Sequence, residues 1–357
     1  MTHLQRFNEA FKDNTAGAVL VNSEANQTWL SGFEFQDGYV LITKEKAYLL
    51  TDFRYIEAAR EETDKDFEII CPNGMAKGIG EILARHGVTE VLFEEATLSV
   101  ATLKMFEERI EGVTFSMGAS RIIDGLREYK DEEELDTIAK AQDIADAAFE
   151  HILKVMTPNM TEIEVALELE FFMRKNGAKA ASFDIISVSG SASSLPHGVP
   201  RNVKLQKGFL TMDYGALYKG YCSDMTRTVV IGKADAEMKR LYNTVLKAQA
   251  AAIDAAAPGV ECRMMDKIAR DIINEAGYEG YFGHGLGHGV GRYIHEAPSL
   301  SFRAPEGKLL TPGHVVTVEP GIYIEGKYGC RIEDMLAITE NGIRNFTHSK
   351  KELIELF

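Results

Sequence analysis

Five residues that can bind metal ions stand in four short segments, each predicted to be a strand edge beside glycines. In chain order they are Asp213, Asp224, His288, Glu319 and Glu333. Burying a carboxylate in an apolar strand is costly unless a partner neutralises it. Four carboxylates and one imidazole, brought together, make an oxygen-rich pocket that suits two divalent metal ions about 3.5–4 Å apart. The residue types therefore predict a metallohydrolase.

His288 supplies the only nitrogen in this set of ligands. A set dominated by oxygen favours Mn²⁺ or Co²⁺ over a structural zinc site, although carboxylate-rich dizinc hydrolases keep Zn²⁺ open. His284 precedes His288 by four residues, but the glycines around them argue against a helical pair of zinc ligands. His197 precedes His295 by 98 residues, close to the offset of an internal repeat, which favours a place in the site for both.

Other catalytic motifs are absent from the chain. The glycine-rich stretch from Gly283 to Gly291 never matches the G-x-G-x-x-G pattern, which argues against a dinucleotide site. His295-Glu296 lacks the later histidine of the H-E-x-x-H motif. There is no Walker sequence and no nucleophile elbow. The carboxylates and histidines are therefore the candidates for chemistry.

The elements that position the carboxylates are predicted to be strand pairs in a duplicated domain. Asp213 and Asp224 are 11 residues apart, Glu319 and Glu333 are 14 apart, and opposite strands of a hairpin can bring such residues onto one face. Thr157-Pro158 and Ala257-Pro258 stand one hundred residues apart, each between two predicted helices. The repeat predicts two similar α+β halves that face each other and share one site.

The first 125 residues alternate between predicted strands and helices and contain no cluster of metal-ligand type, which predicts an accessory α/β domain (1–125) before the catalytic domain (126–357). Trp29 is expected in its core or at an interface. Strands are predicted over 18–21, 38–42, 47–50 and 90–93, and helices over 53–62, 78–86 and 100–111. A long amphipathic helix is predicted from Tyr129 to about Val155, and Thr161 with Glu164 predicts a capping box that opens the next helix.

The composition is that of a globular protein with ample core: 357 residues, 45% of them hydrophobic. A net charge of −15 favours solubility and gives no support to nucleic-acid or acidic-membrane binding. The acidic run at 131–134 is expected to face solvent from the first turn of a helix. No apolar stretch approaches a membrane span, the N-terminus lacks a signal-peptide pattern, and four scattered cysteines suit reduced thiols. A cytoplasmic location is therefore expected.

On these residues the chain resembles the pita-bread metallopeptidases, a group that includes prolidase, aminopeptidase P, methionine aminopeptidase and creatinase. The order and local contexts of the five ligand positions carry the resemblance, which covers the whole chain. It implies an α+β pita-bread domain of two duplicated halves behind a smaller creatinase-type α/β domain, in a homodimer. The N-terminal domain favours prolidase and aminopeptidase P over methionine aminopeptidase, and the intact ligand set speaks against creatinase.

The resemblance also implies roles for the metal ligands. Asp213 would bind one ion, His288 and Glu319 the other, and Asp224 and Glu333 would bridge the two, most often Mn²⁺. A water or hydroxide between the ions would attack the peptide carbonyl.

Other residues receive roles from the same resemblance. Glu319 would also shuttle the proton, and three histidines would bind the substrate and stabilise the oxyanion: His197, His284 and His295. Two arginines close to the bridging carboxylates would orient them: Arg227 and Arg331.

The implied reaction is hydrolysis of the Xaa-Pro bond in dipeptides or short proline-containing peptides. The alternative is an aminopeptidase P, which releases the N-terminal residue from longer Xaa-Pro peptides. A hydrolase of another amide and a non-catalytic peptide-binding module are further alternatives, but relatives that only bind typically lose metal ligands, and this chain keeps all five.

Overall fold

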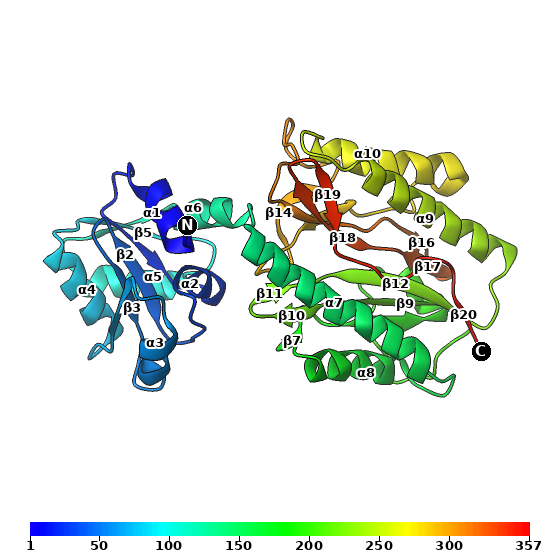
Figure 1. The fold of residues 1–357 in the computed structure, drawn as a ribbon, viewed down its shortest axis with the longest axis horizontal. Helices are drawn as coiled ribbons and strands as arrows, with labels where there is room; N and C mark the ends of the chain where they lie inside the picture. Colours follow the sequence, from blue (N-terminus) through cyan, green and yellow to red (C-terminus); the bar gives the residue numbers. More distant parts are fainter. The chain divides into compact units, whose positions relative to one another are not determined.

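The structure, a computed structural model, describes residues 1–357 and divides into two compact units, Met1–Arg127 and Glu128–Phe357. Figure 1 colours the first unit blue to cyan and the second green to red. None of the helices combines the length and apolar composition needed to span a membrane.

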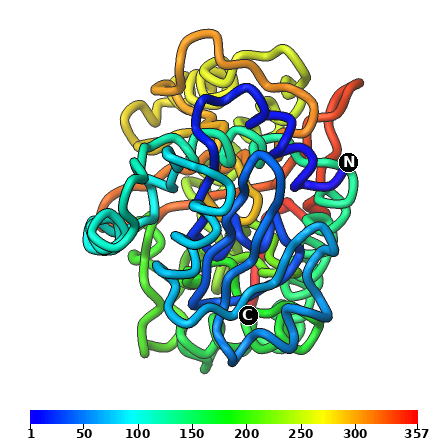
Figure 2. The backbone as a smooth tube through the Cα atoms, turned by 90° about the vertical axis from the view of Figure 1, so that its left-hand side faces the viewer, coloured from blue at the N-terminus to red at the C-terminus, as the bar shows by residue number.

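The N-terminal unit is built on one six-stranded sheet with the order β4-β3-β2-β1-β5-β6. Its strands are β1 (Ala18–Val21), β2 (Tyr39–Thr43), β3 (Ala47–Leu50), β4 (Phe67–Ile70), β5 (Glu90–Phe93) and β6 (Thr114–Met117). β2 runs antiparallel to β1 and β3, whereas β5 runs parallel to β1 and β6. Figure 2 shows the path of this unit facing the viewer, from blue to cyan.

Helices cover both faces of this sheet and bury its alternating side chains in two cores. One face packs against α1 (His3–Phe11), α2 (Glu24–Ser31) and α6 (Ala119–Arg127), and the other against α4 (Met75–Arg85) and α5 (Val100–Arg109); α3 (Ile56–Glu62) adjoins β4. Trp29 is 1% exposed and belongs to the first of these cores, which confirms the core alternative for this residue. The predicted α/β character of this region is confirmed.

The C-terminal unit places curved sheets between two pairs of helices (Figure 1). The helices are α7 (Glu132–Val155), α8 (Glu162–Lys175), α9 (Ala236–Ala255) and α10 (Cys262–Ile273), with a 3₁₀ turn η1 (Gly190–Ser194) and a π turn η2 (Asn274–Tyr278). Thr161 and Glu164 form the predicted capping box of α8. In α7 the box is formed by Asp131 and Glu134, so the helix begins three residues after the predicted start.

The larger strands form a four-stranded sheet, β20-β12-β9-β8, and a five-stranded sheet, β14-β13-β15-β18-β19. The smaller sheets are β11-β10-β7 and β16-β17. The strands are β7 (Ala180–Ala181), β8 (Ile186–Ser189), β9 (Gly208–Tyr214), β10 (Ala216–Tyr218), β11 (Tyr221–Cys222), β12 (Met225–Ile231), β13 (Gly287–Gly289), β14 (Glu296–Leu300), β15 (Val315–Val318), β16 (Gly321–Ile324), β17 (Tyr328–Arg331), β18 (Asp334–Thr339), β19 (Gly342–Asn345) and β20 (Glu355–Leu356).

The predicted duplication is visible in the order of elements. In the first half, α7 and α8 precede the antiparallel pair β9–β12, with the hairpin β10–β11 inserted between the two strands. In the second half, α9 and α10 precede the antiparallel pair β15–β18, with the hairpin β16–β17 inserted. Each half therefore presents one strand pair whose inner ends can carry ligands.

The acidic run at 131–134 differs from its prediction. It does form the first turn of α7, but Glu134 is 4% exposed instead of facing solvent. Its carboxylate accepts a hydrogen bond of 3.0 Å from the Asp131 backbone N–H and another of 2.7 Å from the Tyr221 hydroxyl. A capping-box carboxylate turns back toward the start of its helix, which here faces the protein.

Candidate active site

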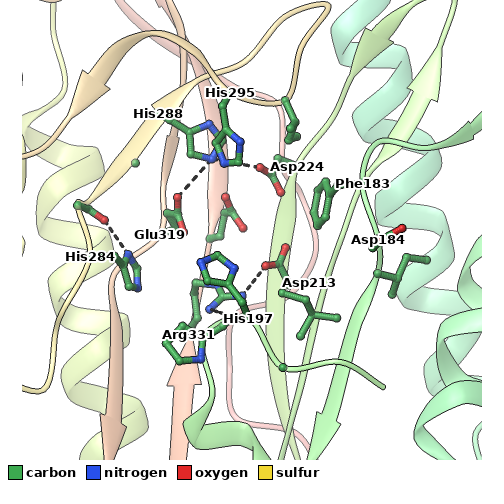
Figure 3. A pocket seen from close by; sticks show the side chains of 18 of the residues that line it. Phe183, Asp184, His197, Asp213, Asp224, His284, His288, His295, Glu319 and Arg331 are labelled. Atoms are coloured by element: carbon green, nitrogen blue, oxygen red, sulfur yellow. Dashed lines mark hydrogen bonds and ion pairs between the residues drawn. The ribbon is translucent and has the colours of Figure 1, made fainter. Parts of the chain in front are cut away.

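A cavity of about 630 Å³ opens in the C-terminal unit, and both halves of the duplicated fold line it. The lining includes all five predicted metal ligands, the three predicted substrate-binding histidines and Arg331. Figure 3 shows Asp213, Asp224 and Glu319 between two groups of side chains, with His288 and His295 on one side and His197 and Arg331 on the other. His197 and Glu333, 136 positions apart in the chain, thus line the same cavity.

The first half contributes Asp213, which lies on β9, and Asp224, which immediately precedes β12. Asp213 pairs with Thr226 across the two strands, so Asp224, two residues before Thr226, lies on the same face. Gly215 makes this close turn possible, because a Cβ there would lie 1.7 Å from the Ser223 carbonyl oxygen. The two carboxylates therefore lie side by side because position 215, in the turn between them, is a glycine.

The second half repeats the arrangement with glutamates. Glu319 follows β15 and Glu333 precedes β18, and the pairing of Val318 with Asp334 places them opposite each other. The Glu333 carboxylate also accepts a hydrogen bond of 2.7 Å from the Thr226 hydroxyl of the first half. The two halves therefore meet at the ligands themselves.

His288 on β13 has the form of a metal ligand. Its Nδ1 lies 3.1 Å from the Gly289 carbonyl oxygen, which fixes the proton on Nδ1 and leaves the Nε2 lone pair free. Nε2 lies 3.5 Å from Asp224 Oδ2 and 3.4 Å from Glu319 Oε1. Burial, together with neighbouring His295, lowers the pKa of His288 to about 4, so the ring is neutral at pH 7.

The buried carboxylates repel one another, and a bound cation would relieve this repulsion. Burial and the nearby Glu333 and Asp213 raise the pKa of Asp224, and burial with Glu319 and Asp213 raises that of Glu333. Burial raises the pKa of Glu319 to about 8. Ligand atoms of Asp224, His288 and Glu333 all lie within 4.8 Å of one another.

One carboxylate oxygen in the cavity lacks a hydrogen-bond partner, which also favours a bound cation. Asp213 Oδ2 accepts a hydrogen bond from Arg331, but Asp213 Oδ1 is buried without any hydrogen-bond partner. A buried, unpaired carboxylate oxygen is rarely left without a cation or donor. Together with the crowded acids and the free imidazole nitrogen, it fits divalent metal ions.

The three other histidines differ in how they face the cavity. His295, just before β14, packs edge-on against His288 with ring centroids 4.3 Å apart. His197 lies in the segment after η1 and lines the cavity (Figure 3). His284 is held by the protein: Nδ1 lies 2.8 Å from the Gly285 carbonyl oxygen and Nε2 lies 3.0 Å from the Tyr323 hydroxyl.

Tyr323 is a site residue that sequence analysis missed. Arg331 donates to its hydroxyl oxygen over 2.6 Å, so the hydroxyl proton is directed to His284 Nε2. Burial, with Arg331 nearby, lowers the pKa of His284 to about 4 and keeps it neutral. The alternation of side chains along β16 was the available signal, because Tyr323 lies on the same face of the strand as Gly321, two residues after Glu319.

The two predicted arginines are both buried, but they act on different groups. Arg331 pairs with the Asp213 carboxylate and also donates to Thr226 Oγ1 over 3.0 Å. Arg227 pairs with Asp334 at 2.9 Å and donates to the Glu333 backbone carbonyl, so it touches no ligand carboxylate. Arg227 therefore holds the strand that carries a ligand, and Arg331 holds a ligand itself.

Comparison with known proteins gives the class that this fold and site define. The sequence of residues 136–340 matches metallopeptidase family M24, and residues 3–129 match the creatinase/prolidase N-terminal domain. The chain belongs to metallopeptidase family M24, with the fold predicted above: a creatinase-type domain followed by a duplicated pita-bread domain.

Three relatives span nearly the whole chain. An Xaa-Pro dipeptidase from Pyrococcus furiosus is 38% identical over 98% of this chain and 99% of that protein. The solved structure of an Xaa-Pro dipeptidase from Bacillus anthracis is 42% identical, with a TM-score of 0.94 over 99% of both chains. That of an X-Pro aminopeptidase from Thermotoga maritima is 33% identical, with a TM-score of 0.91 over 98% of this chain and 100% of that one. This chain is similar to all three in both domains.

Proposed function

We propose that this chain hydrolyses the Xaa-Pro bond of dipeptides, as an Xaa-Pro dipeptidase. The observation that supports this most is the single cavity into which both halves direct four carboxylates and a neutral imidazole. The relatives named Xaa-Pro dipeptidase support the same substrate class. The alternative is release of the N-terminal residue from longer Xaa-Pro peptides, which the similarity to an X-Pro aminopeptidase supports.

Two divalent metal ions would be held by five residues: Asp213, Asp224, His288, Glu319 and Glu333. The oxygen-rich ligands favour Mn²⁺, with Co²⁺ or Zn²⁺ as alternatives. The count of charges supports two ions over one. Four carboxylates against the Arg331 guanidinium leave a net charge of −3, which one divalent cation would bring to −1 and two would bring to +1, a charge that one bound hydroxide would neutralise. When bound, such ions polarise a carbonyl and lower the pKa of a coordinated water.

The chain's own groups supply the proton transfers and the orientation. Glu319, buried beside His288, would accept a proton at a carboxylate oxygen and return it to the leaving proline nitrogen. His197 and His295 line the cavity and would donate hydrogen bonds to the substrate. Both nitrogens of His284 are engaged within the protein, so this residue would contact the substrate through its ring.

The first experiment compares an Xaa-Pro dipeptide with an Xaa-Pro-Xaa tripeptide as substrates. The protein is stripped with a chelator, and each hydrolysis is measured before and after adding Mn²⁺, Co²⁺ or Zn²⁺. We expect metal to restore cleavage of the dipeptide. Cleavage of the tripeptide instead would assign the aminopeptidase P activity, and no cleavage with any metal would overturn both. We also propose that the chain forms a homodimer, as the resemblance implies, and light scattering of the same preparation tests this.

A further inference from the structure

His197 has no side-chain hydrogen bond to another protein group, so its position depends on the backbone that carries it. That backbone runs from the end of β8 at Ser189 to the start of β9 at Gly208, with only the short turn η1 as regular structure. Irregular segments are usually mobile unless they are tied down. The segment must therefore be held by something else for His197 to face the cavity.

A buried carboxylate joins the two sides of the part of this segment, residues 189–201, that carries His197. Glu162, the first residue of α8, is 0% exposed. At one end it accepts hydrogen bonds from the Ser189 backbone N–H and hydroxyl, both 2.7 Å long. At the other end it accepts three bonds from Arg201: from the backbone N–H at 3.0 Å, Nε at 2.8 Å and Nη2 at 2.6 Å.

The charge on Glu162 is fully compensated, which makes this contact specific. Burial alone would raise the pKa of the carboxyl group, but the hydrogen bonds from Arg201 and Ser189 lower it below its usual value. The first turn of a helix also favours a negative charge. A planar guanidinium paired with a carboxylate by two bonds fixes direction as well as distance.

The middle of the segment is fixed by groups of the second half of the fold. Arg331 Nη1 donates over 3.3 Å to the carbonyl of Pro196, the residue before His197. Gly329 donates its backbone N–H over 3.1 Å to the Ser193 hydroxyl. With the ends closed by Glu162 and the middle held by β17, His197 has a defined position.

The second half of the fold repeats the device on the corresponding helix. Asp266 on α10 is 0% exposed, pairs with Arg270 and accepts the Leu286 backbone N–H over 3.0 Å. Arg270 in turn donates to the backbone carbonyl of His284 over 2.7 Å. Each half thus uses a buried acid and an arginine to hold the segment that brings a histidine to the cavity.

We propose that Glu162 and Arg201 form a clamp that positions His197 for the reaction, acting through the backbone of residues 189–201. The inference rests on the proposed hydrolysis of Xaa-Pro peptides. Glu162 and Arg201 are positioning residues, and the segment they close determines where the substrate can be held.

The test uses Glu162→Gln in the full-length, metal-loaded protein. We expect kcat/KM for the Xaa-Pro substrate to fall by about tenfold to a hundredfold, as for a small displacement of a binding group, with metal content unchanged. Hydrogen exchange of residues 190–200 should be faster than in the wild type. Arg201→Lys, which keeps the charge but loses the two-bond pairing, should show the same effects more weakly and serves if Glu162→Gln does not fold.

Arg174→Gln is the matched control. Arg174 also pairs with a glutamate on α8, Glu170, but that pair is exposed, and the further hydrogen bond of Arg174 goes to the Lys179 carbonyl, outside residues 189–201. This variant should leave kcat/KM and the exchange of residues 190–200 unchanged.

Combination with His197→Ala separates positioning from general stability. In that background Glu162→Gln should change kcat/KM by less than about twofold, because the group it positions is gone. Independent, multiplying effects, or unchanged exchange in residues 190–200, would overturn the clamp. If wild-type protein cleaves no Xaa-Pro substrate, the proposed function fails, and the exchange measurement still decides whether Glu162 and Arg201 hold the segment.

Discussion

At the scale of single residues, the site consists of buried carboxylates whose negative charges repel one another. Asp224, Glu319 and Glu333 each have a raised pKa because they are buried near one another. Folding nevertheless directs them into one cavity. Cations that bind the folded chain remove this repulsion, so metal binding and the folded state of this centre support each other.

Replacing Glu333 by alanine should remove metal and activity together. Glu333 would bridge the ions, and the loss of a Lewis-acidic cation removes several kcal/mol of transition-state stabilisation, so we expect kcat to fall by about a thousandfold or more. Metal analysis of the purified variant and its hydrolysis rate are the measurements.

His295→Ala is the contrasting variant, because His295 packs on His288 without supplying one of the proposed ligand atoms. It should keep its metal while turnover falls. Full activity of Glu333→Ala, or loss of metal in His295→Ala, would contradict the assignment of ligands.

Stability at low pH should depend on Glu128, away from the cavity. Burial would raise the pKa of this carboxyl group, but hydrogen bonds from His314 and Lys308 lower it to about 2. A lowered pKa stabilises the fold above the unfolded value of about 4.5 and ceases to do so as pH falls toward 2. Glu128→Gln should therefore cost about 2 kcal/mol at pH 7 and progressively less below pH 4.5, measured by urea unfolding.

At the scale of elements, each carboxylate pair depends on a strand pair interrupted by a small hairpin. β10–β11 interrupts the first pair and β16–β17 the second. The turn out of β9 is so tight at Gly215 that Ser223 approaches its backbone directly. Carboxylate geometry is therefore set by backbone packing as well as by side chains.

Gly215→Ala should disturb both ligands of the first half. A methyl group there would collide with the Ser223 carbonyl oxygen, and relieving the collision must move β9 away from the residue before Asp224. We expect a loss of about 3 kcal/mol in stability and weaker metal binding, measured by urea unfolding and metal titration. Gly283→Ala, where no atom lies within 4 Å of the added carbon, is the control and should be tolerated.

The elements that sequence analysis found are those with strong local signals. Strands β1, β3 and β5 lie where apolar runs predicted them, and the capping box of α8 is where Thr161 and Glu164 placed it. Helix α2 was missed because its buried face includes Asn26 and Gln27, so it shows no apolar period. The burial of Asn26 depends on two partners distant in the chain, Glu94 and Arg127.

The same distinction applies to the candidate site. The five proposed ligands stand in short, glycine-marked segments that can be recognised one at a time, and the internal repeat indicates that they meet. Thr226 and Glu162 act through contacts with residues that their own sequence neighbourhoods do not reveal. The hydrogen bond from Thr226 to Glu333 joins positions 107 residues apart, and no spacing rule predicts it.

At the scale of the whole molecule, the two units can be followed separately. Trp29 is the only tryptophan and lies in the core of the N-terminal unit, whereas all five proposed ligands belong to Glu128–Phe357. Fluorescence therefore reports one unit and metal acts on the other.

Metal should stabilise the C-terminal unit selectively. A ligand at one hundred times its Kd adds about 2.7 kcal/mol to the state that binds it. We expect Mn²⁺ to raise the urea midpoint measured by circular dichroism and to leave the fluorescence transition of Trp29 unchanged. A fluorescence transition that shifts equally with metal would mean that the two units unfold as one cooperative block.

The repeated order of helices and strand pairs has a consequence for the origin of this centre. Neither half holds a complete set of ligands, so an ancestor of half the length would have needed a second copy of itself to build one. Once two copies are fused in one chain, the ligands of each copy can change independently of the other. Here one copy carries two aspartates and the other carries two longer glutamates and the single imidazole. The two proposed ion positions therefore have unequal ligands, and we expect them to fill in two steps of different affinity.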